Sequence, residues 1–502
     1  MPGLILYALC LVAVPLLIPM SWWHGATPAF VVTIGLLGAW RYGWGLLHFC
    51  RGLYYRKVAF PRMRRQVEAL GVAALPSHVY LLITSFRVGV ETTERVYRGA
   101  ITEAIASGLP CTIVASIVDD SDRRLIGRIY DACARNNVGL ILVQIAGTGK
   151  RDALAHAFRA IAAERPGADA AVCVIDGDTI IDPGILRSSL PFLKATPNVG
   201  AFTTDEVCEV EGNRTFRDWY NLRFAQRHVL MSSMGLSRRV LTLTGRMSAF
   251  RSGIVCDPRF IARVEEDHIH HWRFGRLKFL TGDDKSTWYH LLSSGYEMLY
   301  IPDVRITTIE SPPHPDFGIA ATQLMVRWFG NMLRTNSRAL ALGPDRIGFF
   351  TWWSILDQRL SMWTSLAGLT GALLVTVAGA PVLLLGYIYW VALSRFGQTL
   401  MLMTVHQRSS WRYPFLLYFN QIYGSAIKTY ILFHLDRQKW TRQKTVLAGG
   451  KASSEQRWIW LGSHAGHAFS VLLLVVVMGI ALGVLSPQDV AVAAVDLTRS
   501  VS

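Results

Sequence analysis

The chain has few cysteines and few acidic residues for its length of 502 residues. Its seven cysteines include no C-x-x-C pair and lack the dense spacing of a small secreted domain, which indicates reduced, buried thiols. Only 35 acidic residues face 51 basic ones, a formal net charge of +16, yet no basic recognition motif for nucleic acid is present. Because the basic clusters lie beside apolar segments, they are better explained as the basic rim of a membrane protein.

The composition of an ordinary soluble enzyme is also missing, because 51% of the residues are apolar and the mean hydropathy is +0.29. Two apolar segments, 3–20 and 28–50, open the chain, and the first lacks the basic start and cleavage site of a signal peptide. No Lys or Arg separates them, whereas a basic stretch follows the second. The positive-inside rule therefore predicts two membrane helices within 1–50, a cytoplasmic N-terminus and a basic cytoplasmic linker over 51–75.

Apolar segments return beyond residue 340, and the basic loop 436–457 should again be cytoplasmic. We therefore predict a cytoplasmic domain over 76–340 that is inserted between N- and C-terminal transmembrane helices, with residues 341–502 forming the C-terminal part. The segments expected there are membrane helices at 361–378, 380–393 and 463–485, an interfacial or re-entrant segment at 413–435, and a Trp-rich interface helix at 347–360.

Strand and helix patterns alternate from residue 78 onward. This alternation is typical of βαβ units, so an α/β domain with a mostly parallel sheet and flanking helices is predicted. The carboxyl ends of its strands should meet at one edge, where such sheets bind ligands. The expected strands are 78–84, 111–118, 138–144 and 171–175, and the expected helices are 91–107, 122–135 and 150–164.

Three polar features follow predicted strands. Asp176 and Asp178 frame a glycine after the most apolar strand, and two carboxylates so placed suit a hard divalent cation, although an isolated D-x-D is more often a turn. Asp120 ends the second strand and could accept hydrogen bonds from a base or ribose, or only cap a helix. Gly-Thr-Gly-Lys-Arg at 147–151 begins a helix and forms an anion site that is not a Walker loop.

Further candidates lie beyond these strands. Residues 243–251 form a glycine-containing loop, and Asp283 and Asp284 begin a helix, where a carboxylate is either a cap or a general base. Gln323 and Arg327 share a helix face. The acidic and His-rich stretch 265–271 matches no zinc spacing and is expected to be a polar helix or loop.

Taken in order, these features resemble the processive family 2 glycosyltransferases, the membrane-embedded cellulose, chitin and hyaluronan synthases, over about residues 79–336. The resemblance implies a GT-A fold, a nucleotide-sugar donor, a divalent cation (Mg²⁺ or Mn²⁺) and inverting transfer. It implies that Asp178 binds the metal and that Asp284 is the catalytic base. Of the remaining residues, it assigns nucleotide-sugar binding to Asp120, Lys150, Asp176, Arg327 and Trp328, the acceptor or channel mouth to Thr244, Gly245, Arg246, Asp283 and Trp328, and a gating loop to Trp440, Thr441 and Arg442.

The chain departs from the family at several positions. Leu324 stands where the family motif Q-x-x-R-W has glutamine, with Gln323 one residue earlier. The first strand ends in Thr-Ser-Phe-Arg at 84–87, and the gating match lacks its glycine. Within the family, the sequences at 282–288, 311–315, 327–336 and 435–442 are most similar to the bacterial mannuronan (alginate) synthases, which implies GDP-mannuronate as donor.

The resemblance also implies partners. These are the growing polysaccharide, the lipid bilayer of the bacterial inner membrane, a separate cyclic-di-GMP-binding co-polymerase subunit and periplasmic export proteins, but no nucleic acid. Because a polyuronate is anionic, Arg395, Arg412 and Lys428 are candidates for inward-facing charges along its route. Three alternatives remain open: a cellulose-, hyaluronan- or other β-glycan synthase that uses a UDP-sugar, a non-processive transferase acting on a lipid carrier, and a membrane scaffold or transporter with a degenerate domain.

Overall fold

The computed structural model describes residues 2–17, 28–133, 137–405, 410–438, 454–492 and 496. These residues divide into two compact units. One is an α/β unit formed by residues 49–356 and the start of 436–447, and the other is a helical unit formed within 1–48, 357–435 and 448–502. The family-type domain predicted over 76–340 lies in the first of them.

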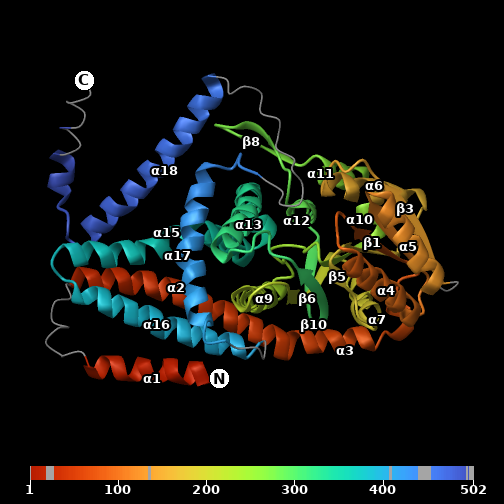
Figure 1. The fold of residues 1–502 in the computed structure, drawn as a ribbon, viewed down its shortest axis with the longest axis horizontal. Helices are drawn as coiled ribbons and strands as arrows, with labels where there is room; N and C mark the ends of the chain where they lie inside the picture. The colour runs from red at the N-terminus through yellow and green to blue at the C-terminus, as the bar shows by residue number, and fades with distance from the viewer. Residues whose placement is uncertain are drawn as a thin grey trace. The chain divides into compact units, whose positions relative to one another are not determined.

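The α/β unit is built on one eight-stranded sheet in the order β3-β2-β1-β4-β7-β6-β10-β5. The first four of these strands run parallel, whereas β7 is antiparallel to both of its neighbours and β5 is antiparallel to β10. The sheet is therefore mixed, with a parallel half as predicted (Figure 1). The strands are β1 Val79–Thr84, β2 Cys111–Ile117, β3 Val138–Gln144, β4 Ala171–Asp176, β5 Thr179–Ile180, β6 Val199–Val210, β7 Met247–Arg251 and β10 Glu297–Glu310.

The parallel half agrees closely with the expected strands and helices. Its connecting helices are α4 Val90–Ser107, α5 Asp120–Cys133 and α6 Lys150–Ala163, each within two residues of its predicted start. Strand β4 is buried along its apolar run, which explains why that run shows no alternation of polar and apolar residues. Helices α4 and α6 pack on the strands of this half, and their apolar faces complete its core.

The other half of the α/β unit brings three long elements to the same region. They are α9 Arg214–Gly235, α12 Asp283–Ser293 and α13 Phe317–Leu340. Helix α9 packs on β6 and β10, and α12 packs against α13. The stretch 265–271, expected as a polar helix or loop, ends α11 Pro258–Glu265 and then forms strand β8 His268–His271 of a hairpin with β9 Gly275–Lys278.

The expected basic linker 51–75 is helical. It comprises the end of α2 Pro28–Tyr54, a π-helix at Tyr55–Ala59, α3 Phe60–Glu68 and a short 3₁₀ helix. Within the α/β unit, the Tyr55 hydroxyl donates to the Tyr300 carbonyl at 2.7 Å, and Arg64 Nε donates to Asp303 at 2.9 Å. These contacts attach the segment to β10, so it is part of the folded unit.

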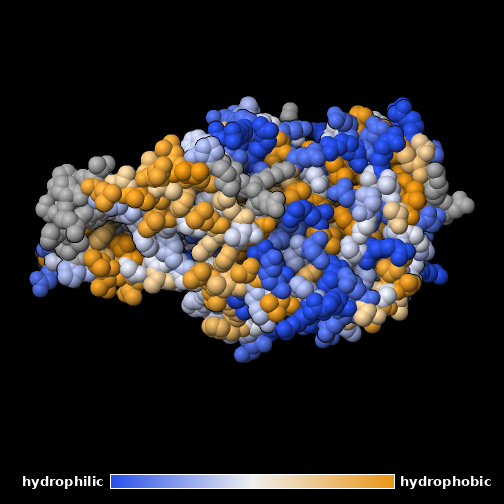
Figure 2. Space-filling model, turned by 90° about the horizontal axis from the view of Figure 1, so that it is seen from below, coloured by the Kyte–Doolittle hydropathy of each residue, from blue (hydrophilic) through white to orange (hydrophobic). Residues whose placement is uncertain are grey.

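The helical unit contains long apolar helices. Three helices of the described residues are long and apolar enough to cross a membrane: Pro28–Glu68, Phe349–Val377 and Gln456–Ala481. Figure 2 shows hydrophobic side chains gathered on the surface of the apolar helices. The exposed large apolar side chains of this unit include Leu6, Leu36, Leu385 and Leu472. The described helices of this unit are α1 Pro2–Leu17, the first part of α2, α15 Phe349–Val377, α16 Val382–Met403, α17 Tyr413–Phe433 and α18 Ser454–Ala481.

One expectation for the C-terminal part needs correction, and a second is narrowed. Helix α15 runs without interruption from Phe349 to Val377, so 347–360 is not a separate interface helix. Helix α17 is continuous from Tyr413 to Phe433, which excludes a re-entrant turn there, whereas an interfacial position for this segment stays a prediction. Within the helical unit, Arg395 is 7% exposed and its guanidinium bonds to Gln398 and Gln421. Polar side chains therefore meet inside this unit rather than on its apolar surface.

Candidate active site

A cavity of about 310 Å³ opens at the carboxyl ends of the parallel strands of the α/β unit. Residues from β1, β2, β4 and β10 line it from the sheet, and α6, α9, α12, α13 and neighbouring loops contribute the other walls. This is the edge at which open α/β sheets bind ligands. Among its lining residues are ten of the predicted site residues: Lys150, Asp176, Asp178, Thr244, Gly245, Arg246, Asp283, Asp284, Arg327 and Trp328.

The turn after β4 places two carboxylates on the cavity wall. Gly177 lies so close to β1 that a Cβ there would stand 2.6 Å from the Thr84 carbonyl, and its own N–H donates to that carbonyl at 2.9 Å. The next residue is held from the other side, because Ile309 N–H donates to the Asp178 carbonyl at 2.8 Å. Glycine between Asp176 and Asp178 is therefore required by packing, and the D-G-D turn is fixed between two strands.

Lys150 is the cation at the centre of the cavity's acidic side. Its Nζ lies 2.5 Å from Asp176 Oδ1 and 3.1 Å from Asp283 Oδ2. Burial lowers the pKa of Lys150, but the two carboxylates outweigh burial and raise it above its usual value. The pKa of Asp283 is correspondingly lowered, because Lys150 and Arg151 outweigh the opposing effect of burial. Lys150 and Asp283 are therefore both charged.

Asp284 differs from Asp283 although the two are adjacent in the first turn of α12. Its Oδ2 accepts a hydrogen bond from Thr242 at 3.2 Å, and its Oδ1 accepts the Lys285 N–H at 2.9 Å. Burial, followed by the charge of Asp283, raises the pKa of Asp284. A carboxylate with a raised pKa that lines a cavity is suited to accept a proton from a hydroxyl group.

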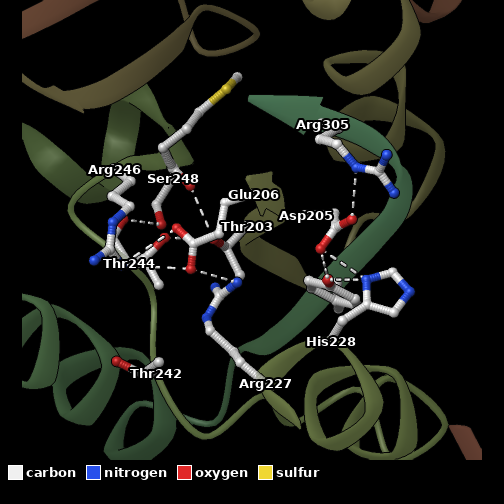
Figure 3. Close-up of polar contacts among 12 residues, drawn as sticks. Thr203, Asp205, Glu206, Arg227, His228, Thr242, Thr244, Arg246, Ser248 and Arg305 are labelled. Atoms are coloured by element: carbon white, nitrogen blue, oxygen red, sulfur yellow. Dashed lines mark hydrogen bonds and ion pairs between the residues drawn. The ribbon is translucent and has the colours of Figure 1, made fainter. Parts of the chain in front are cut away.

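The loop before β7 lies against the lysine–aspartate pair. A Cβ on Gly245 would stand 2.8 Å from Lys150 Nζ and 2.9 Å from Asp176 Oδ2, so any larger residue here would displace this pair of side chains. The preceding Thr244 is 7% exposed, and its carbonyl accepts the Ser248 hydroxyl at 2.7 Å while its hydroxyl lies 3.1 Å from that of Thr203 (Figure 3). These hydrogen bonds fix the loop in place.

Arg246 links two glutamates that the sequence did not single out. Its guanidinium lies 2.6 Å from Glu310 Oε1, at the end of β10, and 3.3 Å from Glu206 Oε2 on β6. Glu206 is 1% exposed and also pairs with Arg227 of α9 at 2.7 Å, so Figure 3 shows it between two arginines. The neighbouring Asp205 points to the opposite face of the strand, as successive residues do, and lies away from this cluster.

Helix α13 supplies the last wall of the cavity. Arg327 and Trp328 line it, and so does Leu324, which is 3% exposed. Gln323 is exposed and does not contribute to the lining. The position that carries glutamine in the family motif is therefore apolar here, and Gln323 does not replace it.

Of the predicted site residues that the structure describes, Asp120 does not line the cavity. Asp120 begins α5 with its side chain 70% exposed, near Arg123 at 3.8 Å and within 3.1 Å of Gln144 Nε2. Val118, two residues earlier, lines the cavity instead. A nucleotide role for Asp120 stays a prediction. The proposed gating residues Trp440, Thr441 and Arg442 lie outside the described residues.

Gln438 contacts the segment next to the cavity, and the sequence did not indicate this. Its Nε2 donates to the Lys278 carbonyl at 2.8 Å, and its Oε1 accepts the Leu280 N–H at 3.0 Å. Leu280, Thr281 and Gly282 line the cavity just before Asp283. The amide thus holds the segment that leads into α12. No local signal marks it, because its partners lie about 160 residues away along the chain.

Replacing Gln438 with alanine should loosen this segment. Two hydrogen bonds are lost and the Leu280 N–H loses its acceptor, which should destabilise the ordered form of the segment by about 1–3 kcal/mol. Because Asp283 and Asp284 follow this segment directly, we expect kcat to fall about tenfold. Q438E retains an acceptor for the Leu280 N–H, so its kcat should lie between those of wild type and Q438A. The exposed Gln226 of α9 offers a control of the same residue type, and Q226A should leave kcat unchanged. Equal kcat values for wild type and Q438A would show that Gln438 does not position the segment before α12.

Comparison with known proteins agrees with this geometry. Residues 76–331 match the family model described as Glycosyltransferase like family 2. A glycosyltransferase alg8 of Pseudomonas syringae pv. tomato is 46% identical over 482 residues, covering 95% of this chain and 98% of that protein. A glycosyltransferase alg8 of Azotobacter vinelandii is 45% identical, covering 93% of this chain and 95% of that protein.

Among solved structures, the mannosyltransferase PcManGT from Pyrobaculum calidifontis, in complex with GDP-Man and Mn²⁺, aligns with a TM-score of 0.45 and 16% identity. The alignment covers 80% of this chain and 98% of that one. The family match spans the sheet and the cavity walls, and the alg8 relatives span nearly the whole chain. The chain therefore belongs to the family 2 glycosyltransferases, with a GT-A-like fold, and is a glycosyltransferase.

Proposed function

We propose that the enzyme is a processive polysaccharide synthase that transfers mannuronate from GDP-mannuronate to a growing β-1,4-polymannuronate, the precursor of alginate. The observation that carries the proposal is the meeting of Lys150, Asp284, Arg327 and Trp328 in one cavity with the D-G-D turn. The relatives named alg8, at 45–46% identity, support this member of the family. Transfer would invert the anomeric configuration.

The roles follow from charge and position. Asp284, with its raised pKa, would take the proton of the acceptor hydroxyl as that oxygen attacks the anomeric carbon from the face opposite the leaving diphosphate. Lys150 and Arg327 would offset the negative charge that grows on the diphosphate. Such electrostatic stabilisation of the transition state is usually the largest contribution to catalysis. Trp328 offers a flat aromatic surface for the acceptor sugar. Asp176 would contact the nucleotide.

A divalent cation, Mg²⁺ or Mn²⁺, fits the donor set at the D-G-D turn. Asp178 lines the cavity, and carboxylate oxygens are the ligands that such hard ions prefer. Within the described residues no three His, Cys, Asp or Glu side chains gather into a closed metal site. Asp178 would therefore hold the ion together with phosphate oxygens of the donor and water, as Mg²⁺ sites in nucleotide enzymes do. When bound, the ion supplies positive charge at the leaving diphosphate.

The membrane helices support a synthase of the bacterial inner membrane whose catalytic unit faces the cytoplasm. The basic residues that follow the first apolar segments favour this orientation by the positive-inside rule. Export of the chain between the C-terminal helices belongs to the same proposal, and the buried Arg395 is suited to an anionic product. A separate cyclic-di-GMP-binding co-polymerase subunit and periplasmic export proteins remain expected partners.

The donor is tested with membranes that contain the full chain. They are incubated with GDP-mannuronate, UDP-glucose or UDP-N-acetylglucosamine, one at a time, and polymer is measured by mass and by length. We expect long polymer from GDP-mannuronate alone, and its loss on chelation of divalent cations. Polymer from a UDP-sugar would replace the proposed donor. A single sugar added to a lipid would instead identify a non-processive transferase.

A further inference from the structure

Arg223 lies on α9 beside the tryptophan wall of the cavity. Its guanidinium carbon is 4.0 Å from the ring centroid of Trp328 and 5.1 Å from that of Trp219. The rings of the two tryptophans are themselves 5.8 Å apart, and Tyr220, one turn before Arg223, lines the cavity. Arg223 is partly exposed, so its donors remain accessible to a ligand. The arrangement is a cation over the face of an aromatic ring that lines the cavity.

The carboxylates of this wall are already paired with other arginines. Glu206 pairs with Arg227 at 2.7 Å and with Arg246 at 3.3 Å (Figure 3). Glu310 pairs with Arg246 at 2.6 Å. In the part of the chain that the structure describes, Arg223 makes no hydrogen bond or ion pair with another residue. Arg223 therefore has no carboxylate bonded to it, whereas Arg227 and Arg246 share the two glutamates.

A half-buried guanidinium with no bonded carboxylate is unusual beside a cavity. Burial lowers the pKa of Arg223 to about 10, helped by the nearby charge of Arg246 and opposed by Tyr220 and Glu310. The guanidinium therefore keeps its charge at neutral pH without a counter-ion. A charge removed from water is unfavourable unless it is paired, and the two aromatic rings compensate only in part. An anionic ligand at this place would complete the pairing.

We propose that Arg223 binds the carboxylate of a mannuronate residue of the growing chain as that sugar lies on Trp328. The inference rests on the proposed function and names the group that recognises the acid of the product. A guanidinium stacked on a ring keeps its N–H donors in the plane of its edge, where they can bind a carboxylate with two parallel hydrogen bonds. A neutral glycan offers no such partner, so Arg223 selects an acidic acceptor chain.

The test measures binding of two probes to the purified full-length protein. One probe is a short oligomannuronate, and the other is the same oligomer with its carboxyl groups chemically reduced. Hydrogen bonds to charged groups contribute about 1.5–3 kcal/mol, so R223Q should weaken binding of the oligomannuronate about 10- to 100-fold. Binding of the reduced oligomer should be the same in wild type and R223Q, because it lacks the carboxylate.

Two further variants make the test specific. R217Q removes a positive charge from an exposed position on the same helix and should bind both probes as wild type does. R223K keeps the charge but loses the two parallel hydrogen bonds, so its affinity for the oligomannuronate should lie between those of wild type and R223Q. If R223Q fails to fold, R223K replaces it in the binding test. If R223Q and R223K bind the oligomannuronate as tightly as wild type, the proposal is wrong. The donor test described above decides the proposed function independently, because polymer formation from GDP-mannuronate by wild type does not depend on the role of Arg223.

Discussion

Asp284→Asn is expected to lower the rate of sugar transfer by about 10²- to 10⁴-fold, the range that a general base contributes. The amide cannot accept the proton of the acceptor hydroxyl at neutral pH. It has nearly the same shape, and the Thr242 hydroxyl can rotate to keep its contact of 3.2 Å. Donor-nucleotide affinity should therefore change little. The measurements are initial rates of polymer formation in membranes and nucleotide binding to purified protein.

A matched control is D345N, which makes the same change at an exposed position of the α/β unit and should leave the rate unchanged. The pH dependence of the transfer rate shows whether Asp284 acts as a base or only holds the loop in place. Because burial and Asp283 raise the pKa of Asp284, wild-type activity should fall on the acid side at a higher pH than an ordinary aspartate would give. D283N removes the neighbouring charge and should shift that acid limb to lower pH. Normal synthesis by D284N would eliminate Asp284 as the base.

Lys150→Met should reduce kcat/KM for the donor by about 10²- to 10³-fold, because one preorganised charge at the leaving diphosphate is lost. It should also destabilise the α/β unit. Removing one partner of a buried ion pair costs about 3–5 kcal/mol, and partial exposure of this pair lowers the expectation to about 2–3 kcal/mol. Thermal unfolding of the purified protein and donor kinetics provide the two measurements.

The double variant K150M/D176N distinguishes catalysis from folding. It removes a carboxylate that K150M leaves without its 2.5 Å partner, so much of the lost thermal stability should return. Activity should stay low, because the cation that faces the donor is still missing. K150R keeps the charge on a larger group and should retain stability better than K150M. Donor kinetics of K150M within about threefold of wild type would contradict a phosphate role for Lys150.

The parallel half of the sheet could be predicted from local sequence. The run before Asp176 is continuously apolar because β4 is buried, and the glycines around Lys150 mark a helix start. Such signals depend on neighbouring residues alone. The resemblance to family 2 supplied the order of the motifs, and the family match over residues 76–331 confirms it.

The antiparallel half could not be predicted in the same way. Glu310 reaches the cavity only because β10 pairs with β6 over a long sequence separation, and Glu206 is understandable as a buried acid only once Arg227 and Arg246 are seen beside it. Asp120 shows a second limit of local sequence, although its nucleotide role stays a prediction. It follows a strand as the other acids do, yet its side chain is 70% exposed. Position at a strand end does not determine where a side chain points.

The sequence by itself determined the fold class, the glycosyltransferase family and ten residues of the cavity, because buried strands, glycine turns and apolar helices leave local patterns. Only the tertiary structure decided which charges are paired. Lys150 is balanced by Asp176 and Asp283, and Arg246 by two glutamates, whereas Arg223 rests on Trp328. The physical reason is that Coulomb interactions depend on distance and burial in space, which the order of residues does not reveal.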